Sequence, residues 1–245
     1  MKTLIVIPSR LAATRLPGKP LLKINGLSMI SHVVTIANNA NIGEVIVATE
    51  DQEIIEDVNK NGGKAILTNN NHKTGTDRIY EAVKKLGKKD IDYVMNLQGD
   101  EPLMNIDDIK NLNNLMIKNK LELGTLASKI KDERIYKNES VVKVITQESL
   151  EISKFPEALS FTRNSNNTTK NVYHHLGIYC YQLGTLKKFV SYKQSQNEIK
   201  NKLEQLRALD NNIKINVTLA KSSPIGVDTK EDFVAIKKIM EYKNK

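Results

Sequence analysis

The sequence predicts an α/β protein built on a mostly parallel β-sheet with helices on both faces. In the first half, short β-branched runs alternate with longer amphipathic runs, which is typical of strands alternating with helices. The polar loops of that half follow the strands, and 245 residues suit one domain with a substantial core. Right-handed crossovers would place the carboxyl ends of the strands at one sheet edge, where ligands bind in such folds.

The first half contains four predicted strands and three predicted helices. Runs rich in β-branched residues predict the strands TLIVI (3–7), EVIVAT (44–49), KAILT (64–68) and DYVMNLQ (92–98). Amphipathic runs between them predict the helices SMISHVVTIANNA (28–40), DQEIIEDVNKNG (51–62) and GTDRIYEAVKKLG (75–87). The order therefore predicts consecutive βα units.

From Leu123 onward the βα alternation stops. The runs LGTLASKI, SVVKVIT and VYHHLGIYCY predict an inserted or antiparallel layer, and the polar stretch 163–171 is expected to be disordered or a mobile flap. The last part predicts a helix over NEIKNKLEQLRAL, a strand over KINVTLA and a final helix after GVDTKED. With no repeat and no long linker, we expect a single domain, 1–245, whose middle section at about 123–197 is organised differently.

The composition narrows the possible partners. The 37 Lys and Arg outnumber the 28 Asp and Glu, and a net charge of +9 fits nucleic acid, an anionic membrane surface or acidic small molecules. The lysines are scattered without aromatic interleaving, which disfavours nucleic acid. Cys180 is the only cysteine, so we expect a small core residue in a reducing cytoplasm. No apolar run is long enough for a signal peptide or a membrane span, so we expect a soluble protein without a membrane partner.

The loop after the first strand, PSRLAATRLPGKP, holds three cations among three prolines. It lacks the glycine and the Ser or Thr of a P-loop, and no G-x-G-x-x-G follows any strand. Arg10, Arg15 and Lys19 would suit a polyphosphate, while the alternative is a basic surface turn. Their mutual repulsion predicts a loop that becomes ordered when an anion binds.

Two acidic segments also follow strand-like runs. LQGDEP places Asp100 and Glu101 at the end of a buried strand, where hard oxygens would suit Mg²⁺ beside phosphate or a cap on the next helix. GVDTKED offers Asp228 as a second metal candidate, with Thr229 and Asp232 spaced as a helix cap. One aspartate could thus bind metal while the others cap.

Three further motifs contain candidate polar residues. HKTGTDR stands ahead of a helix, a position that attracts anions. His174 and His175 are adjacent in a strand, so at most one faces a given site, and a zinc site has too few ligands. Glu204 and Arg207 in LEQLRAL are expected to form a solvated pair on a helix.

Together, these motifs resemble the 3-deoxy-manno-octulosonate cytidylyltransferase family. The segments VIPSRLAATRLPGKPLL, HKTGTDR, NLQGDEPL, HLGIYCY, LEQLRAL and GVDTKED stand in the family's order and extend from about residue 3 to about 235. The resemblance implies a nucleotidyltransferase (Rossmann-like) fold with a smaller dimerisation lobe and a homodimer. It also implies the reaction of CTP with 3-deoxy-manno-octulosonate (Kdo), which gives CMP-Kdo and pyrophosphate for the inner core of lipopolysaccharide.

The resemblance also implies roles for individual residues. Arg10, Arg15 and Lys19 would bind the CTP phosphates, Asp100 and Asp228 would bind Mg²⁺, and Arg10, Lys19 and both aspartates would be catalytic. The remaining residues would line the nucleotide or the sugar: Ala12, Thr74, Gly75 and Arg78 on the nucleotide side, and Gln98, Arg163, His175, Glu204 and Gln205 on the sugar side.

The chain departs from the family pattern at the flap, where TRNSNNTTKN is shorter and more polar than usual. Ser9 replaces a usual Ala, Thr74 a usual Ser and Asp210 a usual Glu. An altered flap could indicate 8-amino-8-deoxy-Kdo as the sugar, and a sialic-type acid is a further alternative. From a different class, the net charge leaves a non-catalytic nucleotide-binding or nucleic-acid-binding module as the competing hypothesis.

Overall fold

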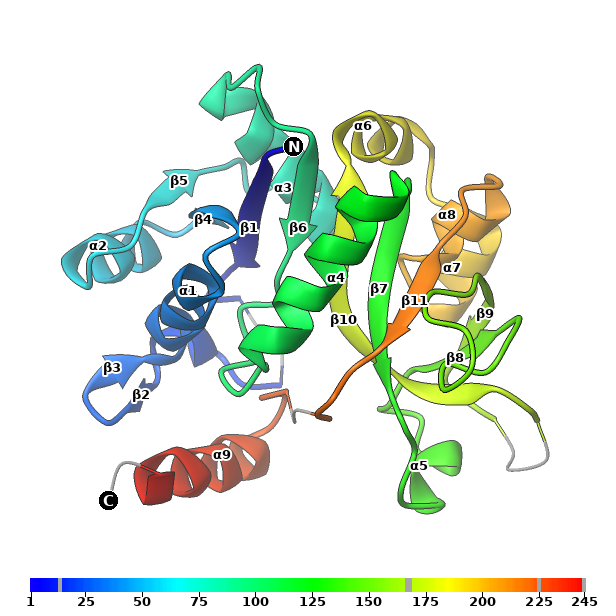
Figure 1. Cartoon of the computed structure of the whole chain (residues 1–245). Helices are drawn as coiled ribbons and strands as arrows, with labels where there is room; N and C mark the ends of the chain where they lie inside the picture. The colour runs from blue at the N-terminus through cyan, green and yellow to red at the C-terminus, as the bar shows by residue number, and fades with distance from the viewer. Residues whose placement is uncertain (13–14, 166–168, 224–225, 244–245) are drawn as a thin grey trace. The chain divides into compact units, whose positions relative to one another are not determined.

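A computed structural model of the chain describes residues 1–12, 15–165, 169–223 and 226–243 (Figure 1). It separates into two compact units. The first unit comprises residues 2–109 and 224–245, and the second comprises residues 110–223 together with Met1. The single domain with a smaller section at about 123–197 stays a prediction, and each unit is described by itself.

The first unit contains a parallel sheet with β1 (Thr3–Ser9) inside it. On one side β1 pairs with β4 (Gly43–Thr49), which pairs in turn with β5 (Ala65–Leu67), and on the other side it pairs with β6 (Tyr93–Asn96). Leu4 to Ile7 are at most 1% exposed, as expected for a strand covered on both faces. The predicted strands of the first half are therefore confirmed.

Three helices cover this sheet: α1 (Met29–Ala40), α2 (Gln52–Lys60) and α3 (Gly75–Leu86). The chain moves outward from β1 through β4 to β5 and then returns past β1 to β6. With right-handed crossovers, this reversal places α1 and α2 on one face and α3 on the other, as Figure 1 shows. Ligands bind in such folds where the strand order reverses, at the carboxyl ends of the strands.

Short elements and the C-terminal helix complete the first unit. The loop after β1 leads into a 3₁₀ helix, and a small hairpin precedes α1; these elements and the last helix are η1 (Lys19–Leu21), β2 (Lys23–Ile24), β3 (Leu27–Ser28) and α9 (Lys230–Lys243). Ile24, Met29, Val227 and Ile236 form a fully buried apolar cluster. This cluster holds the segment before α9, including Asp228, close to the loop that follows β1.

The second unit has the antiparallel layer that the sequence predicts. β10 (Val172–Gln182) pairs antiparallel with both β7 (Leu123–Ser128) and β8 (Lys143–Thr146). β8 also pairs antiparallel with β9 (Ala158–Thr162), whereas β11 (Asn216–Leu219) pairs parallel with β7. The described part of this unit also contains the helices α5 (Arg134–Lys137), α6 (Leu183–Ser191), α7 (Gln196–Asn201) and α8 (Leu206–Asp210).

Two helical regions differ from the sequence prediction. The helix α4 (Ile106–Asn119), which leads from the first unit into the second, was not predicted, although Ile109, Leu112 and Met116 are spaced for one face and fully buried. The single helix expected over NEIKNKLEQLRAL is wrong, because α7 ends at Asn201, Lys202 then has a left-handed φ of 53°, and α8 starts separately at Leu206.

Cys180 lies on β10 and is fully buried, as the sequence predicts, and burial raises the pKa of its thiol. Among the described residues, no helix combines the length and the apolar character needed to cross a bilayer. Of the stretch 163–171 expected to be a mobile flap, residues 166–168 lie outside the described residues, as do residues 13–14 of the loop after β1.

Candidate active site

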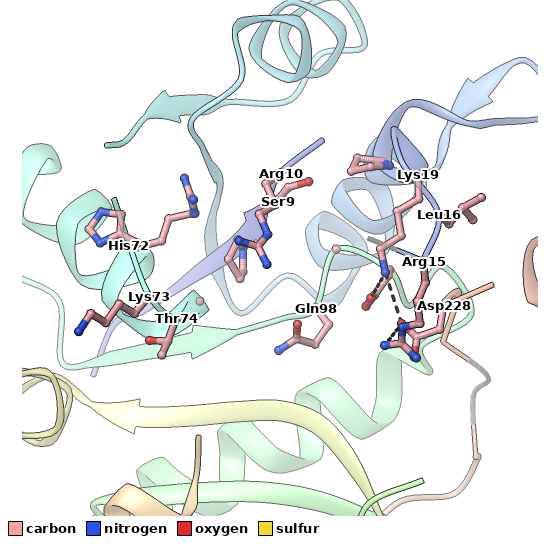
Figure 2. A pocket seen from close by; sticks show the side chains of 16 residues that line it. Ser9, Arg10, Arg15, Leu16, Lys19, His72, Lys73, Thr74, Gln98 and Asp228 are labelled. Atoms are coloured by element: carbon pink, nitrogen blue, oxygen red, sulfur yellow. Dashed lines mark hydrogen bonds and ion pairs between the residues drawn. The ribbon is translucent and has the colours of Figure 1, made fainter. Parts of the chain in front are cut away.

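A cavity of about 340 Å³ lies in the first unit, where the loops after β1 and β6 meet the start of α3 (Figure 2). In Figure 2, His72, Lys73 and Thr74 stand at one end and Arg15, Lys19 and Asp228 at the other, with Ser9, Arg10 and Gln98 between. The predicted site residues that line it are Arg10, Arg15, Lys19, Thr74, Gly75, Arg78, Gln98, Asp100 and Asp228. Ala12, predicted to line the nucleotide, is exposed and lies outside this set.

The most charged end of the cavity is a cluster of two cations and two carboxylates. Lys19 Nζ lies 2.5 Å from Asp100 Oδ2 and 3.6 Å from Asp228 Oδ1, and it donates to the Val227 carbonyl at 2.8 Å. Arg15 Nη2 lies 3.0 Å from the same oxygen of Asp228. The predicted repulsion within the loop is therefore largely offset, because two of its three cations are paired with the predicted metal acids.

Local hydrogen bonds hold the loop and the acids in place. The Gly18 N–H donates to the Leu11 carbonyl at 3.0 Å, and Gly18 has a φ of 69°, which only glycine adopts without strain. The Val227 N–H donates to the Asp100 carbonyl at 2.9 Å, which ties the segment before α9 to the acidic loop. The two acidic segments, far apart in the sequence, thus meet at one point.

Asp232 and Thr229 cap α9, which leaves the Asp228 carboxylate to the cavity. Asp232 Oδ2 accepts from the N–H groups of Asp228 and Thr229 at 3.1 and 2.9 Å, and Thr229 Oγ1 accepts from the Asp232 N–H at 3.2 Å. The capping pattern read from the sequence is confirmed. Capping and cation binding are divided between neighbouring aspartates.

The opposite end of the cavity is the N-terminus of α3. Thr74 is its N-cap, and Thr74 Oγ1 accepts from the Asp77 N–H at 3.3 Å. His72 is hydrogen-bonded to Glu81. Burial raises the pKa of Glu81, but hydrogen bonds from Lys85, His72 and the Asn69 N–H outweigh burial and bring that pKa down to about 2. Backbone N–H groups at this terminus favour an anion.

Two acidic residues at the end of β4, which sequence reasoning missed, contact Arg78 in the cavity wall and the main chain of the loop after β1. Glu50 pairs with Arg78, which is only 4% exposed and also donates to Thr68 Oγ1 at 2.7 Å. Asp51 accepts from the Leu11 N–H at 2.7 Å. The sequence did contain a signal for these two residues, because acidic residues that directly follow a parallel strand lie at the sheet edge where ligands bind.

The predicted sugar residues, apart from Gln98, belong to the second unit. His175 on β10 is 8% exposed, its Nε2 lies 3.0 Å from Thr125 Oγ1, and burial lowers its pKa to about 3. His174 has a different partner, Ser223 Oγ at 3.0 Å, which agrees with adjacent strand residues facing opposite sides. Gln205 is 7% exposed, so this candidate is largely buried.

Arg163 holds its guanidinium against main-chain carbonyls. Its Nη1 donates to the Glu139 carbonyl at 3.0 Å, and its Nη2 donates to the Lys202 carbonyl at 3.4 Å. The side chain therefore joins the end of β9 to the segment before β8 and to the C-terminus of α7. This places the predicted sugar ligand beside the α7–α8 connection.

The sequence predicts that Glu204 and Arg207 form a solvated pair, and the expected solvation is wrong for Arg207. Arg207 is 2% exposed and makes two hydrogen bonds of 2.8 and 2.6 Å to Glu198, which is 3% exposed. Its guanidinium also lies 4.6 Å from the centre of the Phe189 ring. Burial raises the pKa of Glu198, but hydrogen bonding to Arg207 outweighs it and leaves that pKa lowered. Glu204 and Gln205 stand in the connection that this buried pair braces.

Sequence comparison identifies the family to which this fold and cavity belong. A family model described as cytidylyltransferase matches residues 4–215. The chain belongs to the cytidylyltransferase family. The matched range covers the loop after β1, the acidic loop after β6 and the α7–α8 connection.

Relatives that match this cytidylyltransferase over nearly all of its residues have names that also state the sugar. A 3-deoxy-manno-octulosonate cytidylyltransferase of Afipia carboxidovorans is 41% identical over 244 residues. The match covers 97% of this chain and 96% of the Afipia chain. The solved structure of CMP:2-keto-3-deoxy-manno-octonic acid synthetase complexed with CTP is 35% identical, with a TM-score of 0.89, and covers 99% of this chain and 100% of its own. UDP-glucose pyrophosphorylase complexed with UDP-glucose matches at a TM-score of 0.74 and 16% identity over the full length of both chains, a likeness of fold. The predicted nucleotidyltransferase fold is confirmed.

Proposed function

We propose that this cytidylyltransferase transfers CMP from CTP to the anomeric hydroxyl of Kdo and releases pyrophosphate, a step that supplies the inner core of lipopolysaccharide. The observation that carries the proposal is the cavity in which Arg10, Arg15 and Lys19 meet Asp100 and Asp228. Cations for a triphosphate and carboxylates for a metal are the groups that nucleotidyl transfer requires. Relatives at about 40% identity over the full length carry the name of this activity.

The cationic loop and the start of α3 would bind the triphosphate. The sugar hydroxyl must attack the α-phosphorus in line with the departing pyrophosphate, so the protein acts mainly by positioning and by neutralising charge. Arg10, Arg15 and Lys19 would stabilise the negative charge that grows on pyrophosphate. The N-terminal N–H groups of α3, at Thr74 and Gly75, would face an anion at the other end of the cavity.

The oxygens around Lys19 fit Mg²⁺. Asp100 Oδ2, Asp228 Oδ1 and the Val227 carbonyl all lie within 3.6 Å of one cationic atom, Lys19 Nζ, and hard oxygens are the ligands that Mg²⁺ prefers. We assign Asp100 and Asp228 as the residues that would hold the metal. When bound, Mg²⁺ would supply Lewis-acid chemistry, which lowers the pKa of a coordinated hydroxyl.

Lys19 has two possible sets of partners in this scheme. Its ammonium is held by the metal acids, and the phosphates of CTP would offer it and Arg15 a stronger concentration of negative charge. We propose that both cations move from the carboxylates to the phosphates when CTP binds. Asp100 and Asp228 would then be free to bind a divalent cation.

One of the proposed sugar ligands would supply a positive charge, and the others would supply hydrogen bonds. Arg163 would supply the positive charge for the Kdo carboxylate. His175, whose pKa of about 3 keeps it neutral near pH 7, would contribute a hydrogen bond rather than a charge, together with Gln98, Glu204 and Gln205. The proposal also includes a homodimer in the cytoplasm, which the family resemblance implies and sedimentation would test.

A pyrophosphate-release assay with CTP and Mg²⁺ tests the proposed function. Kdo is the expected sugar, and 8-amino-8-deoxy-Kdo is the second candidate because the segment 163–171 is short and polar. A sialic acid serves as an acidic sugar of a different class, and ATP, GTP and UTP serve as control nucleotides. Release that requires both CTP and Kdo, with CMP-Kdo as the product, is the expected result. No release with any sugar would leave a non-catalytic nucleotide-binding module as the better account.

A further inference from the structure

Asp51 stands at a helix N-cap without capping its helix. It precedes α2 with a φ of −103° and a ψ of 122°, the extended backbone expected of an N-cap residue. An N-cap aspartate ordinarily accepts a hydrogen bond from the second or third N–H of its own helix. Asp51 makes no such side-chain bond. A residue that breaks a local rule in this way is a candidate for another role.

The Asp51 carboxylate instead accepts a hydrogen bond from the cationic loop that follows β1. Asp51 Oδ2 accepts from the Leu11 N–H at 2.7 Å, across 40 positions of sequence. The N–H of Asp51 itself donates at 3.1 Å to Thr49 Oγ1, and Thr49 is fully buried at the end of β4. The main chain of Asp51 is thus anchored at the end of β4, and its carboxylate reaches from there to the loop.

Both main-chain polar groups of Leu11, which belong to the two successive peptide planes around its Cα, are hydrogen-bonded. Its N–H is held by Asp51, and its carbonyl accepts from the Gly18 N–H at 3.0 Å. Arg10 directly precedes Leu11, and Lys19 directly follows Gly18. A single residue therefore sets where both cations leave the base of the loop.

The charge of Asp51 argues for a positional role. A carboxylate beside a loop that binds phosphate opposes the anion electrostatically, so it does not improve the field of the site. The preceding residue, Glu50, shows the same use, since it holds Arg78 in the cavity wall. Both acids at the end of β4 thus hold parts of the cavity without adding positive charge to it.

We infer that Asp51 is a positioning residue for nucleotide binding: through the Leu11 N–H it fixes the base of the loop that carries Arg10 and Lys19. This inference rests on the proposed function for the identity of the anion, CTP. The contact itself is independent of which sugar accepts the nucleotide.

Two substitutions separate position from charge. Asp51→Asn keeps an oxygen that can accept from Leu11 but removes the negative charge, whereas Asp51→Ala removes both. Calorimetric titration with CTP in the absence of sugar measures the dissociation constant, and steady-state assays give KM and kcat. Ser195→Ala is the control, because Ser195 caps its own helix, α7, through the Glu198 N–H at 3.1 Å.

A positioning role predicts different results for the two variants. The dissociation constant of CTP should rise about tenfold in Asp51→Ala, the scale of a lost hydrogen bond to a charged group, and stay within about twofold in Asp51→Asn. KM for CTP should follow the dissociation constant, and kcat should also fall in Asp51→Ala, because Arg10 and Lys19 are proposed to stabilise the charge that grows on pyrophosphate. Ser195→Ala should lower the melting temperature without changing CTP binding.

Several results would overturn the inference. Tighter CTP binding in both Asp51 variants would mean that the carboxylate acts only by charge. A lower melting temperature in Asp51→Ala with unchanged CTP binding would mean that its role is only structural. Equal weakening in Ser195→Ala would mean that the effect is not specific to this contact.

Amide exchange of the unmodified protein keeps the inference testable if Asp51→Ala fails to fold. The Leu11 amide should exchange at least about tenfold more slowly than in an unstructured peptide. Exchange at the peptide rate would show that the contact does not persist and would overturn the inference. If the wild-type protein bound no CTP, the proposed function would fail, while the exchange of Leu11 would still decide the contact.

Discussion

Lys19 has the surroundings of a bound metal ion. Its side chain is 15% exposed, and two carboxylates and one carbonyl surround its ammonium. Two like charges cannot share this space, because a divalent ion about 4 Å from an ammonium is repelled by several kcal/mol at an effective dielectric constant near 20. In the nucleotide-free protein, Lys19 should therefore compete with the metal.

Replacing this lysine should open the metal site without nucleotide. We expect Lys19→Met to bind Mn²⁺ at least about tenfold more tightly than the wild-type protein in the absence of CTP. Electron paramagnetic resonance of free Mn²⁺ measures this binding. Lys23→Met, which removes an exposed lysine nearby in the sequence, is the matched control. Equal Mn²⁺ affinities in the three proteins would contradict the competition.

The buried His175 of the second unit should make the stability of the protein depend on pH. Burial lowers its pKa to about 3, against 6.5 for an unperturbed histidine, so between these values the unfolded chain binds a proton that the folded chain does not. Stability should therefore fall as pH decreases from about 6.5 toward 3, by about 1.4 kcal/mol per pH unit from this group. Urea denaturation at pH 7 and pH 5 measures the loss.

His175→Gln isolates the contribution of this histidine, because glutamine does not titrate. The variant should lose about 2 kcal/mol less than the wild-type protein between pH 7 and pH 5, whatever its absolute stability. An identical pH dependence in both proteins would mean that folding does not lower the pKa of His175.

The break between α7 and α8 shows where an element cannot be predicted from periodicity. Glu198 and Arg207 are nine residues apart, about two and a half turns, so one continuous helix would place them on opposite sides. Their buried ion pair therefore requires the chain to turn, and Lys202 makes that turn at a φ of 53°. Lysine gives no sequence signal for a left-handed residue, so pattern reasoning favours a single helix.

The same pair should dominate the stability of these two short helices. Arg207→Met leaves Glu198 charged and buried without its partner, which should cost about 3–5 kcal/mol of unfolding free energy. The double variant Glu198→Gln with Arg207→Met removes the charge as well and should recover part of that loss. Urea denaturation measures both, and a cost below about 1 kcal/mol for Arg207→Met would show that the pair is not important for stability.

Elements with strong local signals were predictable, and those defined by distant partners were not. The strands of the first unit are confirmed because burial on both faces produces continuous apolar runs. The cap at Thr229 is confirmed because a cap is local chemistry. Asp51 was missed because its partner, Leu11, lies 40 residues away.

At the scale of the whole molecule, the candidate site is assembled from segments far apart in the chain. The loop after β1, the end of β6 and the segment before α9 meet in one cavity of the first unit. The sequence identified the residues because each stands at the end of a strand or the start of a helix. It did not show that the cations and the acids pair with each other, since that depends on the segment before α9, with Val227 and Asp228, lying beside the loop after β1.

We propose above that Asp100 and Asp228 serve cytidylyl transfer in this cavity. The most direct test is pyrophosphate release from CTP and Kdo by Asp100→Asn and Asp228→Asn at limiting Mg²⁺, with CTP binding measured in parallel. We predict that each variant loses at least about 100-fold in turnover while still binding CTP. Turnover near the wild-type rate in both variants would contradict the assignment.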